Sequence, residues 1–179
     1  MSYPWYQIVN ESSEIRQGDL ISNCPIVIPP SEFGNVTSSD YDIEVNSLNT
    51  VVISQSCDLI LEKLEIVLVC PYLTLNDFFG QLPESERQGK ARKKNLERLK
   101  QGNFPAYHLL NRDTESGLSD FLVVDFRNVY GVNFAFLKTF ARSIKVRHRL
   151  LPPYREHLSQ AFARFFMRVG LPNDITDLN

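Results

Sequence analysis

Positive charge is nearly absent from the first 80 residues of this 179-residue chain, which contain eleven acidic residues but only two basic ones, Arg16 and Lys63. The chain also lacks the marks of several functional classes. No apolar run approaches the roughly 18 residues that span a bilayer, and no Gly-x-Gly is present to hold a phosphate. The first six residues lack the basic start and apolar stretch of a secretory signal. We therefore expect a cytoplasmic protein with no membrane partner.

Cysteine is scarce as well, with three residues that are too widely spaced for a disulfide framework. A metal site made from cysteine and histidine usually needs two ligand pairs at short spacing. No Cys-x-x-Cys occurs, and a Pro-Pro pair separates His148 from His157. We expect neither a metal nor another cofactor.

Positive charge is concentrated later in the chain, in two segments. Residues 87–100 and residues 142–168 each carry seven basic residues and one acidic residue, although the net charge of the chain is only -2. A domain polarised in this way is suited to contact a charged surface. Hydrophobic residues make up 43% of the chain, enough for one core, so we expect a single domain over residues 1–179.

The expected strands lie between about residue 15 and residue 151. Residues 50–54 and 65–70 are β-branched and continuous, which is typical of buried strands, and the polar residues 31–49 indicate a long loop. Residues 143–151 alternate in polarity and predict a half-buried strand. Its outer face is expected to be cationic and to carry Lys145, Arg147 and Arg149.

Two helices are expected. Residues 84–101 predict an exposed, basic, inserted helix that is followed by a C-cap glycine, Gly102. Residues 154–169 place their apolar side chains on one stripe and predict an amphipathic helix that packs on the sheet. Short strands with these two helices favour an α+β fold, built around a small, partly open β-barrel.

The order of motifs resembles the ribonuclease-toxin family of the MazF and PemK type, which adopts an SH3-like barrel. The matching pieces are Gly18-Asp19-Leu20-Ile21, Val51-Val52-Ile53-Ser54 and Val69-Cys70-Pro71-Tyr72-Leu73-Thr74, followed by a strand with Asp125 and a C-terminal helix. The resemblance implies a groove near Ser54, Ser56, Cys57, Asp58 and Thr74.

The residues that carry the family's ribonuclease chemistry are not matched. The family's catalytic arginine precedes its second strand, where this chain has Leu48-Asn49-Thr50, and the position of its catalytic threonine is occupied by Leu73. Cleavage of a phosphodiester needs a cation on the phosphate and a group for proton transfer. We therefore assign no catalytic residue and expect a binding module rather than an enzyme.

Several interpretations of the charged segments remain open. The leading hypothesis is a MazF-like binding module that recognises an acidic protein surface, as an accessory or regulatory component of a prokaryotic defence or toxin–antitoxin-like system. The alternative is an RNA-binding protein or divergent endoribonuclease, and Cys57 as a hydrolase nucleophile is a third reading. A homodimer that pairs acidic with basic surfaces fits as well. The expected partner- or nucleic-acid-binding residues are Arg87, Lys90, Arg92, Lys93, Lys94, Arg98, Arg147 and Arg149.

Overall fold

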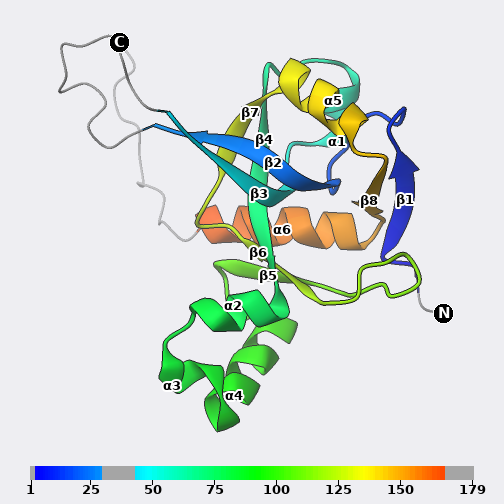
Figure 1. Ribbon diagram of the computed structural model, residues 1–179. Helices are drawn as coiled ribbons and strands as arrows, with labels where there is room; N and C mark the ends of the chain where they lie inside the picture. The colour runs from blue at the N-terminus through cyan, green and yellow to red at the C-terminus, as the bar shows by residue number, and fades with distance from the viewer. Residues whose placement is uncertain (1–2, 30–42, 168–179) are drawn as a thin grey trace, which may run out of the picture.

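A computed structural model describes residues 3–29 and 43–167 of the chain (Figure 1). Within those residues, none of the helices combines the length and the apolar composition that crossing a bilayer requires. In chain order the elements are β1 (Tyr6–Asn10), β2 (Leu20–Ile28), β3 (Glu44–Val52), α1 (Ser56–Ile60), β4 (Ile66–Thr74), α2 (Leu75–Gln81), α3 (Glu84–Arg87), α4 (Gly89–Lys100), β5 (Tyr107–Leu110), β6 (Leu122–Asp125), β7 (Tyr130–Asn133), α5 (Phe134–Ser143), β8 (Val146–Leu150) and α6 (Tyr154–Phe166).

The long strand β4 organises the larger sheet. One edge of β4 pairs with β3, while the other edge pairs with β7 along its first half and with β6 along its second half. β2 and β5 complete the sheet, and β1 and β8 form a separate two-stranded sheet. All of these strand pairs are antiparallel. The α+β class is confirmed, but the sheets of the described residues do not close into the predicted barrel.

β4 contributes to two hydrophobic clusters, although Ile66 and Leu68 in its first half are exposed. Because successive side chains of a strand point to opposite faces, Val67 and Val69 join the cluster beneath α5, whereas Cys70 and Tyr72 join the cluster beneath α6. Leu158 of α6 is 1% exposed within that second cluster. Full burial of a side chain of this size stabilises a fold by about 1.5–3 kcal/mol.

The C-terminal helix lies across the central strands, as its apolar stripe predicts (Figure 1). Its described part ends at Phe166, and the predicted end at residue 169 lies outside the described residues. Gly102 has φ +66° and follows α4, so the predicted C-cap is confirmed.

Two segments differ from their predicted structure. Residues 31–42 of the predicted loop at 31–49 lie outside the described residues. Its remaining part overlaps β3, which begins at Glu44 in spite of its polar sequence, because β2 supplies antiparallel partners for it. The helix α5 was not predicted. Its apolar residues Phe134, Leu137 and Ala141 are spaced for one helical face, and Asn133 caps it by accepting a hydrogen bond from the Phe136 N–H.

Candidate functional site

The structure overturns the predicted cationic outer face of the strand at 143–151. In β8 the side chains of Arg147 and Arg149 are buried, at 1% and 6% exposure, whereas Val146 is exposed. Both guanidinium groups lie against the fully buried carboxylate of Asp19. Arg149 donates hydrogen bonds to both carboxylate oxygens, and Arg147 Nε lies 3.7 Å from Oδ2. Neither arginine is available to contact a partner or a nucleic acid.

Backbone carbonyls complete this buried charge cluster. Arg149 also donates to the Glu14 carbonyl, and Arg147 donates to three carbonyl oxygens, at 3.3 Å to Asn10, 3.0 Å to Ala141 and 2.8 Å to Ser13. Buried charges are tolerated when they are paired and hydrogen-bonded. The prediction that Arg147 and Arg149 face outward was wrong. Local alternation could not reveal their burial, because the carboxylate that pairs with them belongs to Asp19, 130 residues before Arg149.

The residues predicted to line a groove do not come together. Thr74 lies at the end of β4 where α2 begins, and its hydroxyl accepts a hydrogen bond from the Asp77 N–H at 3.1 Å. Ser54 follows the end of β3, and Ser56, Cys57 and Asp58 lie in α1. This helix is at the opposite end of the molecule from α2 (Figure 1). Thr74 is therefore a helix cap, separated from the group around Cys57.

The group around Cys57 has mainly structural partners. The Ser54 hydroxyl accepts from the Leu68 N–H at 2.8 Å, and the Ser56 hydroxyl accepts from the Gln17 N–H at 3.1 Å. Asp58 lies 3.9 Å from the Lys63 ammonium group. Cys57 is exposed in a shallow depression whose lining includes no histidine. A thiol nucleophile needs a nearby base, and the lining of this depression supplies no imidazole for that role.

The segment predicted as one exposed helix, residues 84–101, forms two helices, α3 and α4, which pack with α2 into a lobe with a core of its own. Phe78, Phe79 and Leu99 are buried there together with Val123 of β6. The helical conformation is interrupted at Gln88, which lies between α3 and α4, and α4 begins at Gly89 with φ +60°. The lobe projects from the sheet at the end of β4 (Figure 1). The lobe packs on β6 of the domain, so its surface residues are held in a defined position relative to the sheet.

The arginines of the lobe serve its packing. The Arg92 guanidinium lies 4.0 Å above the centre of the Phe79 ring, which is a cation–π contact. Arg98 lies 4.1 Å above the ring of Phe104 in the same way. Arg87 donates from Nε to the Leu82 carbonyl at 2.7 Å.

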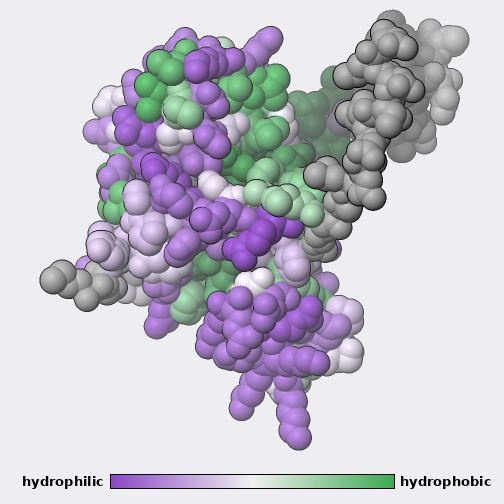
Figure 2. All heavy atoms as spheres, turned by 180° about the vertical axis from the view of Figure 1, so that it is seen from behind, coloured by the Kyte–Doolittle hydropathy of each residue, from purple (hydrophilic) through white to green (hydrophobic). Residues whose placement is uncertain are grey.

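The lysines of α4 have a different setting. Lys90, Lys93 and Lys94 are exposed, and none forms an ion pair with any residue that the structure describes. Their spacing of three and four residues places them on one side of the helix, and we call this set the lysine face. Figure 2 shows the lobe covered by hydrophilic side chains, several of which extend away from the surface.

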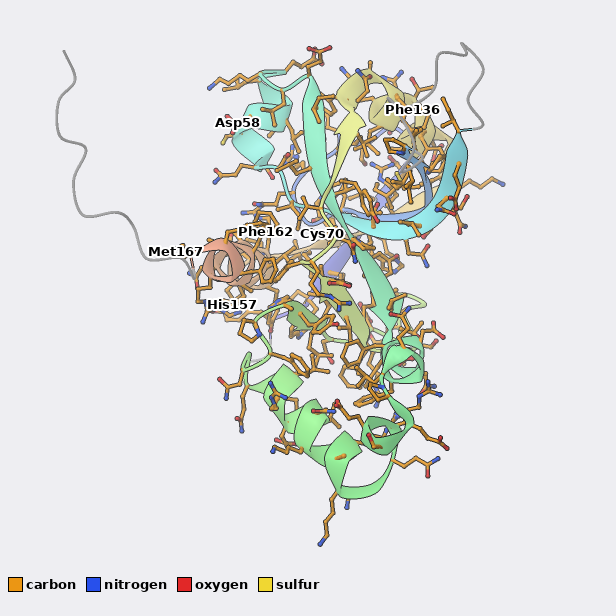
Figure 3. All side chains as sticks on the ribbon, turned by 90° about the vertical axis from the view of Figure 1, so that its left-hand side faces the viewer. Asp58, Cys70, Phe136, His157, Phe162 and Met167 are labelled. Carbon is orange, nitrogen blue, oxygen red and sulfur yellow. The ribbon has the colours of Figure 1, made fainter. Side chains whose placement is uncertain are left out.

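A groove of about 750 Å³ runs between the end of α4, β5 and α6, and we call it the α4–α6 groove. Its apolar lining includes Trp5, Leu99 and Leu109. Four of its other lining side chains are basic or carry an imidazole, and no aspartate or glutamate lines it; the four are Lys100, His108, His157 and Arg164. His157 points from α6 toward the lobe (Figure 3).

The electrostatics of the groove are visible in His108. Burial, together with the charges of His157 and Arg164, lowers the pKa of this imidazole to about 4. The ring is therefore neutral at pH 7. No local sequence pattern marks these residues as a site, because the groove joins Trp5, the end of α4 and the middle of α6, which are distant in the chain.

No protein-family model matches the chain, and no curated protein sequence matches it. Within residues 3–29 and 43–167, no cluster of three or more cysteine, histidine, aspartate or glutamate side chains is arranged to hold a metal ion. The lysine face and the α4–α6 groove are surface features of the described residues that suit a negatively charged ligand.

Proposed function

We propose that this protein is a non-catalytic binding module that recognises an acidic surface on a protein partner through the lysine face of α4. The lobe is the recognition element, and the antiparallel sheets are its scaffold. We further propose that the scaffold is an open relative of the SH3-like barrel of MazF-type proteins. On this proposal the module serves as an accessory or regulatory component of a prokaryotic defence or toxin–antitoxin-like system.

The observation that carries the proposal is the contrast between the arginines and the lysines of the lobe. Arg87, Arg92 and Arg98 have partners within the lobe, whereas the three lysines have no ion-pair partner in the described chain. Three uncompensated charges on one side of a rigid helix produce a local positive field, although the chain as a whole is acidic. Such a field speeds and orients encounter with a negative surface.

The buried state of Arg147 and Arg149 favours a protein partner over RNA. The RNA hypothesis requires both basic segments to face the ligand, and these two arginines instead neutralise Asp19 in the interior. The exposed basic side chains that remain on the lobe are Arg87, Lys90, Lys93, Lys94 and Lys100. Each phosphate contact adds a part of the affinity for nucleic acid, so the loss of two predicted contacts weakens the RNA hypothesis.

The proposal is tested by reversing the charge of the lysine face. Partners captured by the wild-type protein from a lysate of its source organism are identified by mass spectrometry, purified and titrated against the variants. Lys93→Glu/Lys94→Glu should weaken binding about 30-fold, because reversing two exposed charges changes the binding free energy by about 1 kcal/mol each. The effect should shrink as salt is added.

The matched control is Arg142→Glu/Lys145→Glu, which makes the same change of charge at exposed positions on the α5 side of the molecule, away from the lobe (Figure 1). It should leave the affinity within about twofold. Equal weakening by the two variants would mean that net charge, and not the lysine face, determines binding. Binding that neither variant alters would refute the proposed recognition element, and a purified ligand that proves to be RNA would refute the partner class.

A further inference from the structure

The α4–α6 groove begins where the lysine face ends, on the same helix. Leu99 and Lys100 line the groove at the C-terminal end of α4, and Lys94 lies six positions earlier. An α-helix rises 1.5 Å per residue, so the two features are about 9 Å apart along the helix axis. About three residues of extended peptide cover that distance. One ligand segment can therefore occupy both.

The groove combines an apolar lining with cationic groups. Leu99 is 3% exposed and belongs to the core of the lobe, and the Trp5 ring is fixed by stacking on Tyr154, with ring centres 3.7 Å apart. Lys100 and Arg164 are exposed at the groove, from α4 and α6 respectively. This lining suits a ligand that has an apolar group to bury and negative charges on either side of it.

We propose that the α4–α6 groove binds a segment of the protein partner in which acidic residues flank one large apolar side chain. The inference rests on the proposed function and names the chemistry of the segment that is recognised. The apolar side chain packs against Leu109 and the Trp5 ring. Its acidic neighbours pair with Lys100 and Arg164, and further acidic residues reach the lysine face.

A peptide fits this groove better than a single-stranded nucleic acid does. Recognition of single strands usually depends on bases that stack on aromatic rings. One face of the Trp5 ring is covered by Tyr154, one face of Tyr107 by Arg127 at 4.8 Å, and His108 stacks on Phe126. These internal contacts reduce the ring surface that a base would use. The Leu109 side chain and the cationic groups of Lys100 and Arg164 remain available, and these suit an acidic, apolar peptide.

Selection from a random peptide library tests the inference without knowledge of the partner. A phage library of peptides about 12 residues long is selected on the wild-type protein and counter-selected on Arg164→Glu. The enriched sequences should contain aspartate and glutamate around a leucine, isoleucine or phenylalanine. The best peptide is then synthesised and titrated while the emission of Trp5, the single tryptophan of the chain, is recorded. We expect a saturable change that Arg164→Glu weakens at least tenfold.

Arg142→Glu is the matched control for this titration. Arg142 and Arg164 both lie in the last turn of an amphipathic helix, so reversal should cost each helix a similar amount of stability, but only Arg164 lines the α4–α6 groove. The control should bind the peptide within twofold of wild type. Enriched sequences that are neutral or basic, a lack of enrichment, or equal weakening by both variants would overturn the inference.

An oligouridine of about eight nucleotides is titrated in parallel. A change in Trp5 emission at lower concentrations of oligouridine than of peptide would assign the groove to nucleic acid and overturn the inference. The proposed function of the lysine face can be refuted independently of this inference about the groove. If the peptide result is negative while partner capture still depends on Lys93 and Lys94, only the assignment of the groove is wrong.

Discussion

Replacing His108 by glutamine should make the stability of this protein less sensitive to mild acid. His108 lies in β5 opposite Val124 of β6, and its ring stacks on Phe126. Burial and the charges of His157 and Arg164 hold the pKa of the folded-state imidazole at about 4. In the unfolded chain the same group has a pKa of about 6.5. Folding therefore favours the neutral ring.

The sign and size of the effect follow from this difference in pKa. As the pH falls below 6.5, the unfolded chain takes up a proton that the folded protein does not accept until the pH approaches 4. The free energy of unfolding therefore decreases through this window and levels off below it. A difference of this size corresponds to about 3 kcal/mol in total, of which about 2 kcal/mol is lost between pH 7.5 and pH 5.

Urea denaturation at pH 7.5 and pH 5, followed by circular dichroism, measures the effect. The loss of stability between the two pH values should be about 2 kcal/mol smaller for His108→Gln than for the wild-type protein. Any cost of the substitution that does not depend on pH cancels in this comparison. An NMR titration of the His108 ring should give a midpoint near 4. Equal losses for the two proteins, or a midpoint near 6.5, would refute the reasoning.

Three further predictions concern the buried charge cluster, the turn before β2 and the thiols. Asp19→Asn leaves two buried guanidinium groups without their carboxylate and should cost about 3–5 kcal/mol in urea denaturation; a loss below about 1 kcal/mol would contradict the cluster. Gly18→Ala should cost about 1–3 kcal/mol, because Gly18 has φ +82° and the added Cβ would lie 2.9 Å from the Leu150 Cβ; an unchanged melting temperature would count against it. In the native protein one thiol, Cys57, should react with a maleimide, since Cys24 and Cys70 are fully buried; mass spectrometry that finds all three labelled at equal rates would show that the fold opens readily.

Local patterns in the sequence predicted several elements correctly. The β-branched run that ends in Cys70, the apolar stripe of α6 and the glycine after α4 each depend on neighbouring residues, and each has the expected structure. The α+β class follows from such elements. α5 had a readable signal too, because Phe134, Leu137 and Ala141 lie on one face, but its aromatic content resembles that of the adjacent strands.

For the candidate site, too, one part was predictable from the sequence and another part was not. The composition of the 84–101 segment was enough to place the exposed lysines on a helix, and these are the residues on which the proposed function rests. Composition did not separate them from the arginines of the same run, because that distinction depends on Phe79, Phe104 and Leu82 as partners.

By itself the sequence determined the class of the fold, the burial of most apolar residues and the presence of a basic helix, because these follow from periodicity and composition over a few turns or strand residues. Only the tertiary structure decided which charged side chains are exposed to a binding partner and which are buried. It buried Arg147 and Arg149 against Asp19 and brought His108, His157 and Trp5 to one groove. The physical reason is that the cost of burying a charge depends on partners that are distant in sequence and become neighbours only when the chain folds.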